Sequence, residues 1–177
     1  MERNVYTSEK ILLFGYSLVL SFMVLQDAVP LGPFNDIEAV ALERSTAELV
    51  VVTMIGVMQT LLLMGIILLF IGRRYPIWAQ LWLLIHPSCI LAGAMISWWI
   101  PYLFGIGAEE KAASYEAMFG NTHSFLPVMN GIVPNTLHTV FHFILLLCIL
   151  LTFYIFIVEN KREKRLYKKA KEQRERA

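Results

Sequence analysis

The chain lacks the motifs that would assign it to several common enzyme and carrier classes. It contains no Walker loop, no G-x-G-x-x-G turn, no G-x-S-x-G elbow and no C-x-x-C pair. These motifs hold phosphates, a dinucleotide, a serine nucleophile and a redox dithiol, respectively. Nucleotide-driven pumping, serine hydrolysis and disulfide exchange are therefore not supported. The two cysteines, Cys89 and Cys148, lie in apolar runs and are predicted to be buried thiols, although their similar depth leaves a bridge open.

Charged residues are also scarce, and apolar residues take their place. Only 16% of the 177 residues are charged, whereas 57% are hydrophobic and 12% are aromatic. A soluble domain of this size could not bury so much apolar surface. We therefore expect an all-α integral membrane protein, with the lipid bilayer as its main solvent.

Four windows have the length and apolarity of membrane-spanning helices, and none has a Lys or Arg in its interior. They cover residues 11–30, 48–72, 77–104 and 137–158. No small-x-small cleavage site follows the first window, so we expect it to remain as a span. The sequence thus predicts a four-helix transmembrane bundle within residues 1–158, followed by a basic tail over residues 159–177.

The basic residues are distributed unevenly about the predicted membrane. Thirteen of the 15 fall in the N-terminal segment, the turn at 73–76 and the tail. The positive-inside rule then predicts that both termini are cytoplasmic and that the two longer loops are outside. We expect a multi-pass protein of the cell membrane in this N-in, C-in orientation.

Both outer loops carry local helix signals. Residues 36–43 could form a short helix, and Ser45 with Glu48 forms a capping box in front of the second span. The loop between spans three and four has about 30 residues and is predicted to contain an amphipathic helix over 108–119. Residues 134–136 are expected to cap span four.

Three histidines gather near the predicted outer end of span four. His138 and His142 are four residues apart, which puts both rings on one helix face. With His123 they could supply three nitrogen ligands to a metal, and Asp27 and Glu48 could add oxygen ligands or acid–base groups. Alternatively, these side chains hydrogen-bond to one another and tie the loops to the bundle. An H-x-x-x-H pattern without Glu is a weak motif, so the alternatives stay open.

Aromatic residues precede the long outer loop. Trp98, Trp99 and Tyr102 form either an interfacial belt or one wall of a pocket. Asp27 either ends the first span or anchors a cationic ligand, since an ionisable group at the edge of the hydrocarbon is expensive. We predict a ligand-binding pocket at this face, lined by Asp27, Trp98, Trp99, Tyr102, His138 and His142.

Two features inside the spans predict how the helices pack. Gly56, Gly65 and Gly93 are small residues that allow close helix approach. Pro87 frees a backbone carbonyl and is expected to kink span three. His86 beside it marks either a cavity or a hydrogen bond to a neighbouring helix.

The tail has nine basic and four acidic residues in a pattern that suits a helix continuing from span four. Segments of this kind bind anionic lipids. Nucleic-acid binding is disfavoured, because Tyr167 is the one aromatic residue among these charges.

Three strings resemble a group of small bacterial membrane proteins to which no function is attached. They are WWIPY at 98–102, MFGNTHSFLP at 118–127 and PNTLHTVFH at 134–142. A weaker resemblance in layout is to the EXPERA group, the emopamil-binding sterol isomerases and sigma-2 receptor-like proteins. It is carried by Asp27, Glu48, His86 and the basic tail. This resemblance implies four or five spans, cytoplasmic ends and an aromatic cavity that binds sterols or cationic amphiphiles.

We therefore expect a membrane protein that binds a small amphiphilic or lipid-like molecule in an outward-facing polar and aromatic pocket. One alternative is a membrane enzyme or metal-binding protein that uses the histidine cluster. Another is a non-catalytic subunit or assembly factor whose outer loops hold a partner. Four helices seldom enclose a transport path, so transport would require a homodimer. The sequence assigns no cofactor.

Overall fold

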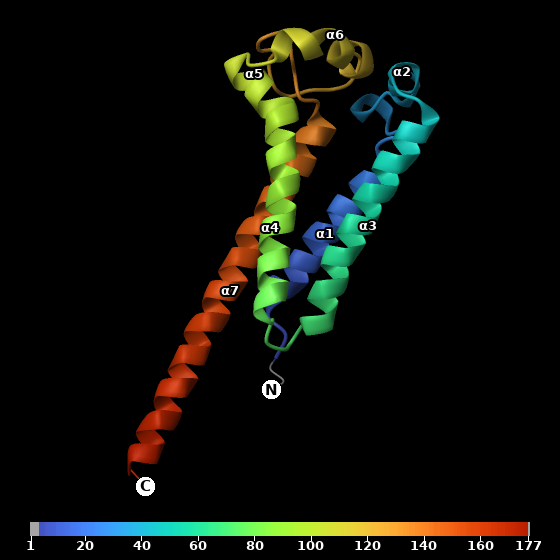
Figure 1. Cartoon of the computed structure of the whole chain (residues 1–177). Helices are drawn as coiled ribbons and strands as arrows, with labels where there is room; N and C mark the ends of the chain where they lie inside the picture. The colour runs from blue at the N-terminus through green and yellow to red at the C-terminus, as the bar shows by residue number, and fades with distance from the viewer. Residues whose placement is uncertain (1–3, 177) are drawn as a thin grey trace.

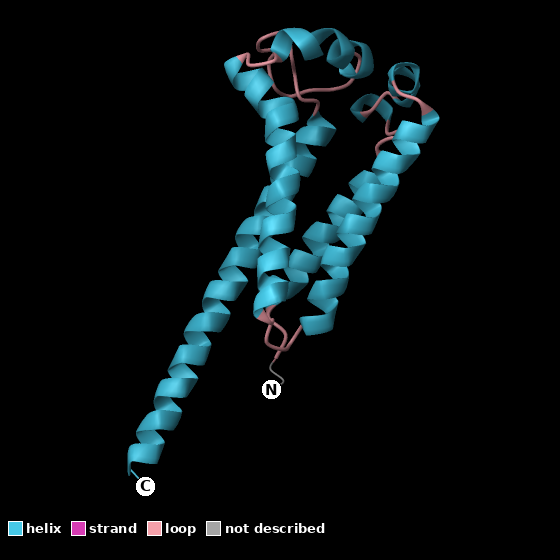
Figure 2. Cartoon of the chain, in the orientation of Figure 1, coloured by secondary structure: helices cyan, strands magenta, loops and turns pink. Residues whose placement is uncertain are grey.

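The computed structural model describes residues 4–176, which form helices joined by short loops (Figures 1 and 2). Within that range the backbone has no β-strand and one isolated β-bridge, between Met129 and Ile132. The elements in chain order are α1 (Thr7–Leu25), the 3₁₀ turn η1 (Gly32–Phe34), α2 (Ile37–Glu43), α3 (Thr46–Phe70), α4 (Ile77–Ala94), the π-helical turn η2 (Met95–Trp99), α5 (Ile100–Phe104), α6 (Ala108–Phe119) and α7 (Thr136–Arg176).

Four helices in residues 4–176 are long and apolar enough to cross a membrane. They are Thr7–Leu25, Thr46–Phe70, Ile77–Phe104 and Thr136–Arg162. The prediction of an all-helical chain with four helices long and apolar enough to span a membrane is therefore confirmed. The third span runs through α4, η2 and α5, and the fourth is the first part of α7, which continues as one helix to Arg176 as predicted for the tail.

The predicted bounds of the first span were wrong at both ends. The helix begins earlier because the Glu9 side chain accepts a hydrogen bond from the backbone N–H of Tyr6 at 2.8 Å, which caps the first turn. It ends at Leu25 rather than near residue 30. Beyond it, the Asn35 side-chain amide donates to the carbonyls of Gln26 and Val29, both at 2.8 Å, and holds a turn there.

The long helices are arranged around α1 and α7. α1 packs against both α3 and α7, and α4 packs against α7, whereas α3 and α4 have few close contacts. Figure 1 shows α3 and α4 close together at the 71–76 turn and diverging towards their other ends. The helix core is apolar and includes Leu12 and Tyr16 of α1, Leu63 and Ile67 of α3, Leu83 of α4, and Leu145 and Ile155 of α7.

Glycine determines the closest helix contacts, but at positions only partly predicted. A Cβ atom on Gly15 would meet the Cys148 sulfur at 2.6 Å, so α1 and α7 approach closely there. A Cβ atom on Gly56 would likewise meet the Met23 sulfur at 2.6 Å, so the predicted role of Gly56 in close helix packing is confirmed. Gly65 and Gly93 have nothing within 4 Å of such an atom, and their predicted packing role was wrong.

Other predictions for the span interiors are also corrected. Cys148 is buried as expected, but Cys89 is exposed, and both thiols are free. The His86 ring stacks on Trp82 with centroids 5.1 Å apart. Its Nε2 atom is buried and has no hydrogen-bond partner in the described part of the chain, so the predicted bond to a neighbouring helix does not form through that atom.

The two ends of the helix assembly differ in construction. We call residues 4–10, the 71–76 turn and α7 beyond Val158 the tail end. Residues 26–45 and 105–135 form the loop end, which carries α2 and α6 (Figure 1). The predicted helices over 36–43 and 108–119 are both present at the loop end, and they pack against each other.

A π-helical turn, which was not predicted, shapes the loop end of the third span. Pro101 has no N–H, so it cannot donate to the carbonyls one turn earlier. The Tyr115 hydroxyl donates instead to the Ser97 carbonyl at 2.9 Å, and Lys111 Nζ donates to the Ile96 carbonyl at 3.1 Å. Both donors lie on α6. Proline thus opens an attachment point in α4–α5, and α6 docks on it.

Candidate functional site

The face of α7 at the loop end carries His138 and His142, as predicted. Their ring centroids are 6.2 Å apart, one helical turn along α7. The indole N–H of Trp99 donates to Nδ1 of His142 at 3.2 Å. An indole nitrogen can only donate, so Nδ1 must be unprotonated and the neutral ring carries its proton on Nε2. Trp99 therefore fixes both the orientation and the tautomer of His142.

His138 is held in the opposite tautomer. The Oδ1 atom of Asn135 accepts from the His138 backbone N–H at 2.9 Å, which confirms the predicted cap of this helix. The same oxygen lies 2.8 Å from His138 Nδ1. Since an amide oxygen can only accept, the proton of the neutral His138 ring is on Nδ1, and Nε2 is a free acceptor.

One cavity lies beside His142 and is almost wholly apolar. This apolar pocket has a volume of about 610 Å³. It is lined by Leu91, Met95, Trp99, Phe125, Thr139, Val140, His142, Phe143 and Leu146. Thr139 Oγ1 is buried and makes no hydrogen bond within residues 4–176. Two of the lining residues, His142 and Thr139, carry polar groups, and the Thr139 hydroxyl is enclosed by protein.

A second cavity lies beside His138 and is more polar. This polar pocket has a volume of about 200 Å³. Its walls come from α2, α3, η2, α6, α7 and the residues that follow α1 and α2, through Gln26, Asp27, Val40, Arg44, Leu49, Val52, Ser97, Trp98, Tyr115, Met118, Phe119 and His138. Residues from both outer loops and from three of the four long apolar segments meet here, because these elements converge at the loop end. The polar pocket is therefore the junction of the loop-end elements.

Aromatic rings form one wall of the polar pocket. The Trp98 ring centroid lies 4.5 Å from Tyr115, 5.1 Å from Phe119 and 4.8 Å from His138. Phe119 also contacts His138 edge-on at 5.2 Å. Trp98 is buried, and the docking of Tyr115 on the carbonyl of Ser97 keeps α6 against it.

The charged groups of the polar pocket are Asp27 and Arg44. Burial raises the pKa of the Asp27 carboxyl above its ordinary value, and the Arg44 cation opposes that rise. Burial also raises the pKa of the Tyr115 hydroxyl, again opposed by Arg44. The electrostatic influence of Arg44 therefore extends across this pocket, although Arg44 was not among the predicted site residues.

The single pocket predicted from the sequence is in fact two. Asp27, Trp98 and His138 line the polar pocket, whereas Trp99 and His142 line the apolar pocket. Consecutive residues on a helix point about 100° apart, and here this difference turns Trp98 towards the polar pocket and Trp99 towards the apolar pocket.

Tyr102, also predicted to line the pocket, lines neither of these two cavities. It is buried, and its hydroxyl donates to the Pro127 carbonyl at 3.0 Å. Its own carbonyl accepts from Asn130 at 2.8 Å. Tyr102 therefore anchors the loop between α6 and α7 on α5.

The structure does not gather the three histidines of the predicted metal site in the part of the chain that it describes. His123 is exposed, and its Nδ1 lies 2.8 Å from the Thr136 hydroxyl oxygen, while its backbone bonds to Pro33 and Thr136. Within the described residues, no three His, Cys, Asp or Glu side chains gather as metal ligands. Glu48 is used by its capping box with Ser45, with bonds of 2.9 and 3.3 Å, as predicted. His123 instead ties the two loops to the start of α7.

The most deeply buried carboxylate, Glu9, lies at the tail end and was not singled out in the sequence. It is completely buried, and Tyr75 donates a hydrogen bond to it at 3.2 Å. Glu159 of α7 is also buried at this end. Close by, Arg162 donates to the Tyr6 hydroxyl at 2.9 Å. These contacts join α1, the 71–76 turn and α7.

Some signals in the sequence could have found the missed residues. Glu9 is the acidic residue nearest the start of the first apolar run, and Arg44 is the one basic residue between the first two spans. Tyr115 lies in the middle of the predicted 108–119 helix. Thr139, however, differs from an ordinary helix threonine only in its surroundings, which the sequence does not state.

No family model, curated protein or solved structure matches the chain. The site must therefore be interpreted from its own geometry, and the two family resemblances stay predictions.

Proposed function

We propose that this protein is a multi-pass protein of the cell membrane, with the tail end in the cytoplasm and the loop end outside. The support is the charge distribution, since twelve of the 15 basic residues belong to the tail end and a thirteenth, Arg3, precedes it in the sequence. The basic part of α7 nearest the membrane would then contact anionic lipids. A reporter fused after Ala177 should be active only inside the cell; activity outside would reverse the orientation.

The function that the geometry supports best is binding of a small amphiphilic or lipid-like molecule in the apolar pocket. The observation that carries this proposal is the Trp99–His142 hydrogen bond beside a cavity of about 610 Å³. Ligand pockets of roughly 300–1,000 Å³ are typically apolar with a few fixed polar groups. Trp99 fixes such a polar group here, because its hydrogen bond to Nδ1 orients the His142 ring and leaves the Nε2–H as the donor.

The polar groups define what such a ligand would carry. His142 offers a donor, and the Thr139 hydroxyl is a buried group with no partner within residues 4–176. A buried polar group without a hydrogen bond costs free energy, and a ligand whose entry opened the wall at the enclosed Thr139 hydroxyl would recover it. The ligand we propose therefore has an apolar body and a hydrogen-bond acceptor such as an ester carbonyl. A cationic head group, as in the EXPERA-like expectation, has no carboxylate in this pocket.

This proposal is preferred to the two alternative functions for structural reasons. A metal centre on three histidines would need His123 beside His138 and His142, and His123 is bonded elsewhere. An assembly factor would use its loops, but α2, α6 and the hairpin at residues 129–132 are packed onto their own chain. The apolar pocket, in contrast, is an open-sided groove of about 610 Å³ with an oriented imidazole in its wall.

The test uses two leucines that differ only in facing the cavity. Leu146 lines the apolar pocket, whereas the adjacent and comparably exposed Leu147 does not. Purified full-length protein would be incubated with monoolein, a neutral lipid with one ester carbonyl, and examined by native mass spectrometry. We expect wild type and Leu147→Trp to retain one monoolein and Leu146→Trp to lose it.

Two further variants examine the polar groups. Thr139→Val keeps the shape of the side chain but removes its hydroxyl, and Trp99→Phe removes the donor that orients His142. Both should lower monoolein retention without abolishing folding. Equal retention by all variants, or no retention by wild type, would contradict the proposal.

A further inference from the structure

The polar pocket contains two opposite charges that do not pair with each other. Asp27 and Arg44 both line it, yet neither side chain forms a hydrogen bond or an ion pair of 4.0 Å or less within residues 4–176. Asp27 is half-buried, so its carboxylate has lost part of its hydration without gaining a bond. A bound group could supply the missing interactions on both sides.

The backbone explains why the charges stay apart. Asp27 lies in the turn after α1, which Asn35 fixes through its bonds to the Gln26 and Val29 carbonyls. Arg44 follows the last turn of α2, whose first turn is capped by Asp36 at 2.9 Å. Each residue is positioned by contacts of its own segment, and the pocket of about 200 Å³ lies between them.

The aromatic wall adds a second recognition element. Trp98, Tyr115 and Phe119 line the pocket together and contact one another at centroid distances of 4.5–6.0 Å. Aromatic faces attract ammonium groups, and tryptophan does so most strongly. A carboxylate beside such rings is a chemically consistent site for an ammonium ion. A ligand with only a positive charge would, however, also be repelled by Arg44.

We propose that the polar pocket binds a small zwitterion, with its ammonium group between Asp27 and the aromatic wall and its anionic group on Arg44. The ammonium interacts with the carboxylate and the rings, and the guanidinium pairs with a phosphate or carboxylate. The volume of about 200 Å³ suits a compact molecule or a lipid head group rather than a whole lipid. This site is separate from the apolar pocket and does not depend on the function proposed there.

The experiment compares three soluble probes on full-length protein in phosphatidylglycerol nanodiscs. The probes are phosphocholine, which has both charges, tetramethylammonium, which has only the positive one, and inorganic phosphate, which has only the negative one. Isothermal titration should give saturable binding of phosphocholine. We expect its affinity to exceed that of either single-charge probe by about tenfold or more.

Charge-removing variants identify the residues. Arg44→Gln should weaken phosphocholine binding about tenfold and leave tetramethylammonium binding unchanged or stronger, because the repelling charge is gone. Asp27→Asn should weaken the binding of both phosphocholine and tetramethylammonium. Glu38→Gln is the matched control, since Glu38 is an exposed loop-end carboxylate outside the pocket. Leu146→Trp, which fills the apolar pocket, should bind phosphocholine as wild type does.

The membrane composition distinguishes a free zwitterion from a lipid head group. If the head group of a lipid occupies the site, nanodiscs of phosphatidylcholine should abolish binding of added phosphocholine, whereas a site for a free zwitterion should still bind it there. Either result supports the zwitterion site. Absence of saturable phosphocholine binding in phosphatidylglycerol nanodiscs, or full binding by Arg44→Gln and Asp27→Asn, would overturn it.

Discussion

The tail end and the loop end each contain a carboxylate withdrawn from water, and the two differ in burial and in hydrogen bonding. Glu9 at the tail end is completely buried and accepts hydrogen bonds from Tyr75 and from the Tyr6 backbone. Asp27 at the loop end is half-buried, and its carboxylate receives no hydrogen bond from the described residues. The nearest compensation is the charge of Arg44, which does not contact it directly.

This difference indicates a structural role for Glu9 and a binding role for Asp27. A buried carboxylate that accepts hydrogen bonds from two other parts of its own chain holds those parts together. A carboxylate left with unused acceptors costs stability and is available to something else. The tail end thus fixes how α1, the 71–76 turn and α7 meet. The loop end, in contrast, keeps Asp27 and Arg44 in one pocket without partners among the described residues.

The largest effect should come from breaking the tail-end cluster. Glu9→Ala removes the buried carboxylate to which the Tyr75 hydroxyl and the Tyr6 N–H donate, so we expect a loss of roughly 3 kcal/mol of unfolding free energy. Denaturant unfolding in mixed micelles measures it. Glu109→Ala, at an exposed glutamate on α6, is the control and should change little. If the two variants were equally stable, Glu9 would not be the structural anchor described here.

The next effect concerns the helix contact that connects the two ends. Gly15→Ala places a methyl group 2.6 Å from the Cys148 sulfur, so α1 and α7 must shift. We expect destabilisation of about 1–3 kcal/mol, typical of overpacking a close contact. Gly65→Ala is the matched control, because nothing lies within 4 Å of its new methyl group. Equal behaviour of the two alanines would show that α1 and α7 do not approach so closely.

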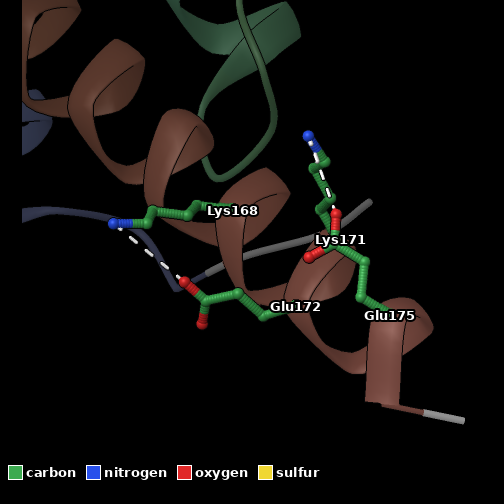
Figure 3. Close-up of polar contacts among 4 residues, drawn as sticks. All are labelled: Lys168, Lys171, Glu172 and Glu175. Atoms are coloured by element: carbon green, nitrogen blue, oxygen red, sulfur yellow. Dashed lines mark ion pairs between the residues drawn. The ribbon is translucent and has the colours of Figure 1, made fainter.

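The smallest effect is expected for the exposed charges of the tail. Lys168 pairs with Glu172 at 4.0 Å and Lys171 with Glu175 at 3.8 Å, each one helical turn apart (Figure 3). Both glutamates are at least half exposed, so solvent screens these pairs. The double change Glu172→Gln and Glu175→Gln should alter thermal stability by less than about 0.5 kcal/mol. A larger loss would mean that surface charge, rather than the buried cluster, stabilises the tail end.

Features encoded by neighbouring residues could be predicted from the sequence. The capping box of Ser45 and Glu48, the helix over 108–119 and the histidine pair on α7 each depend on residues within one or two helical turns. The four long apolar helices follow from composition, because long uninterrupted apolar runs are typical of helices that cross lipid.

Features that depend on which way a helix faces could not be predicted. Gly65 and Gly93 have the same chemistry as Gly15, but only Gly15 among these three faces another helix closely. Trp98 and Trp99 were assigned to one pocket, although neighbouring positions on η2 face different cavities. The π-helical turn depends on Pro101 together with donors that α6 brings from later in the chain. Such partners are known only once the chain has folded.

The most direct test of the contrast between the two ends is the change in melting temperature when each carboxylate becomes an amide. Burial raises the pKa of Asp27 above its ordinary value of 3.8, so the folded state binds this proton more tightly than the unfolded state. The ionised carboxylate therefore costs stability at neutral pH, and the cost disappears as the pH falls through the raised pKa towards 3.8.

Asp27→Asn should accordingly melt above wild type at pH 7.5, with a difference that shrinks on acidification, whereas Glu9→Gln should melt below wild type at pH 7.5. The measurement is differential scanning fluorimetry of both variants in the same detergent. Changes in melting temperature of opposite sign for the two variants would support a tail end bonded by its own chain and a loop end left open for a ligand. A lower melting temperature for both variants would show that the protein already satisfies Asp27, and would contradict the account.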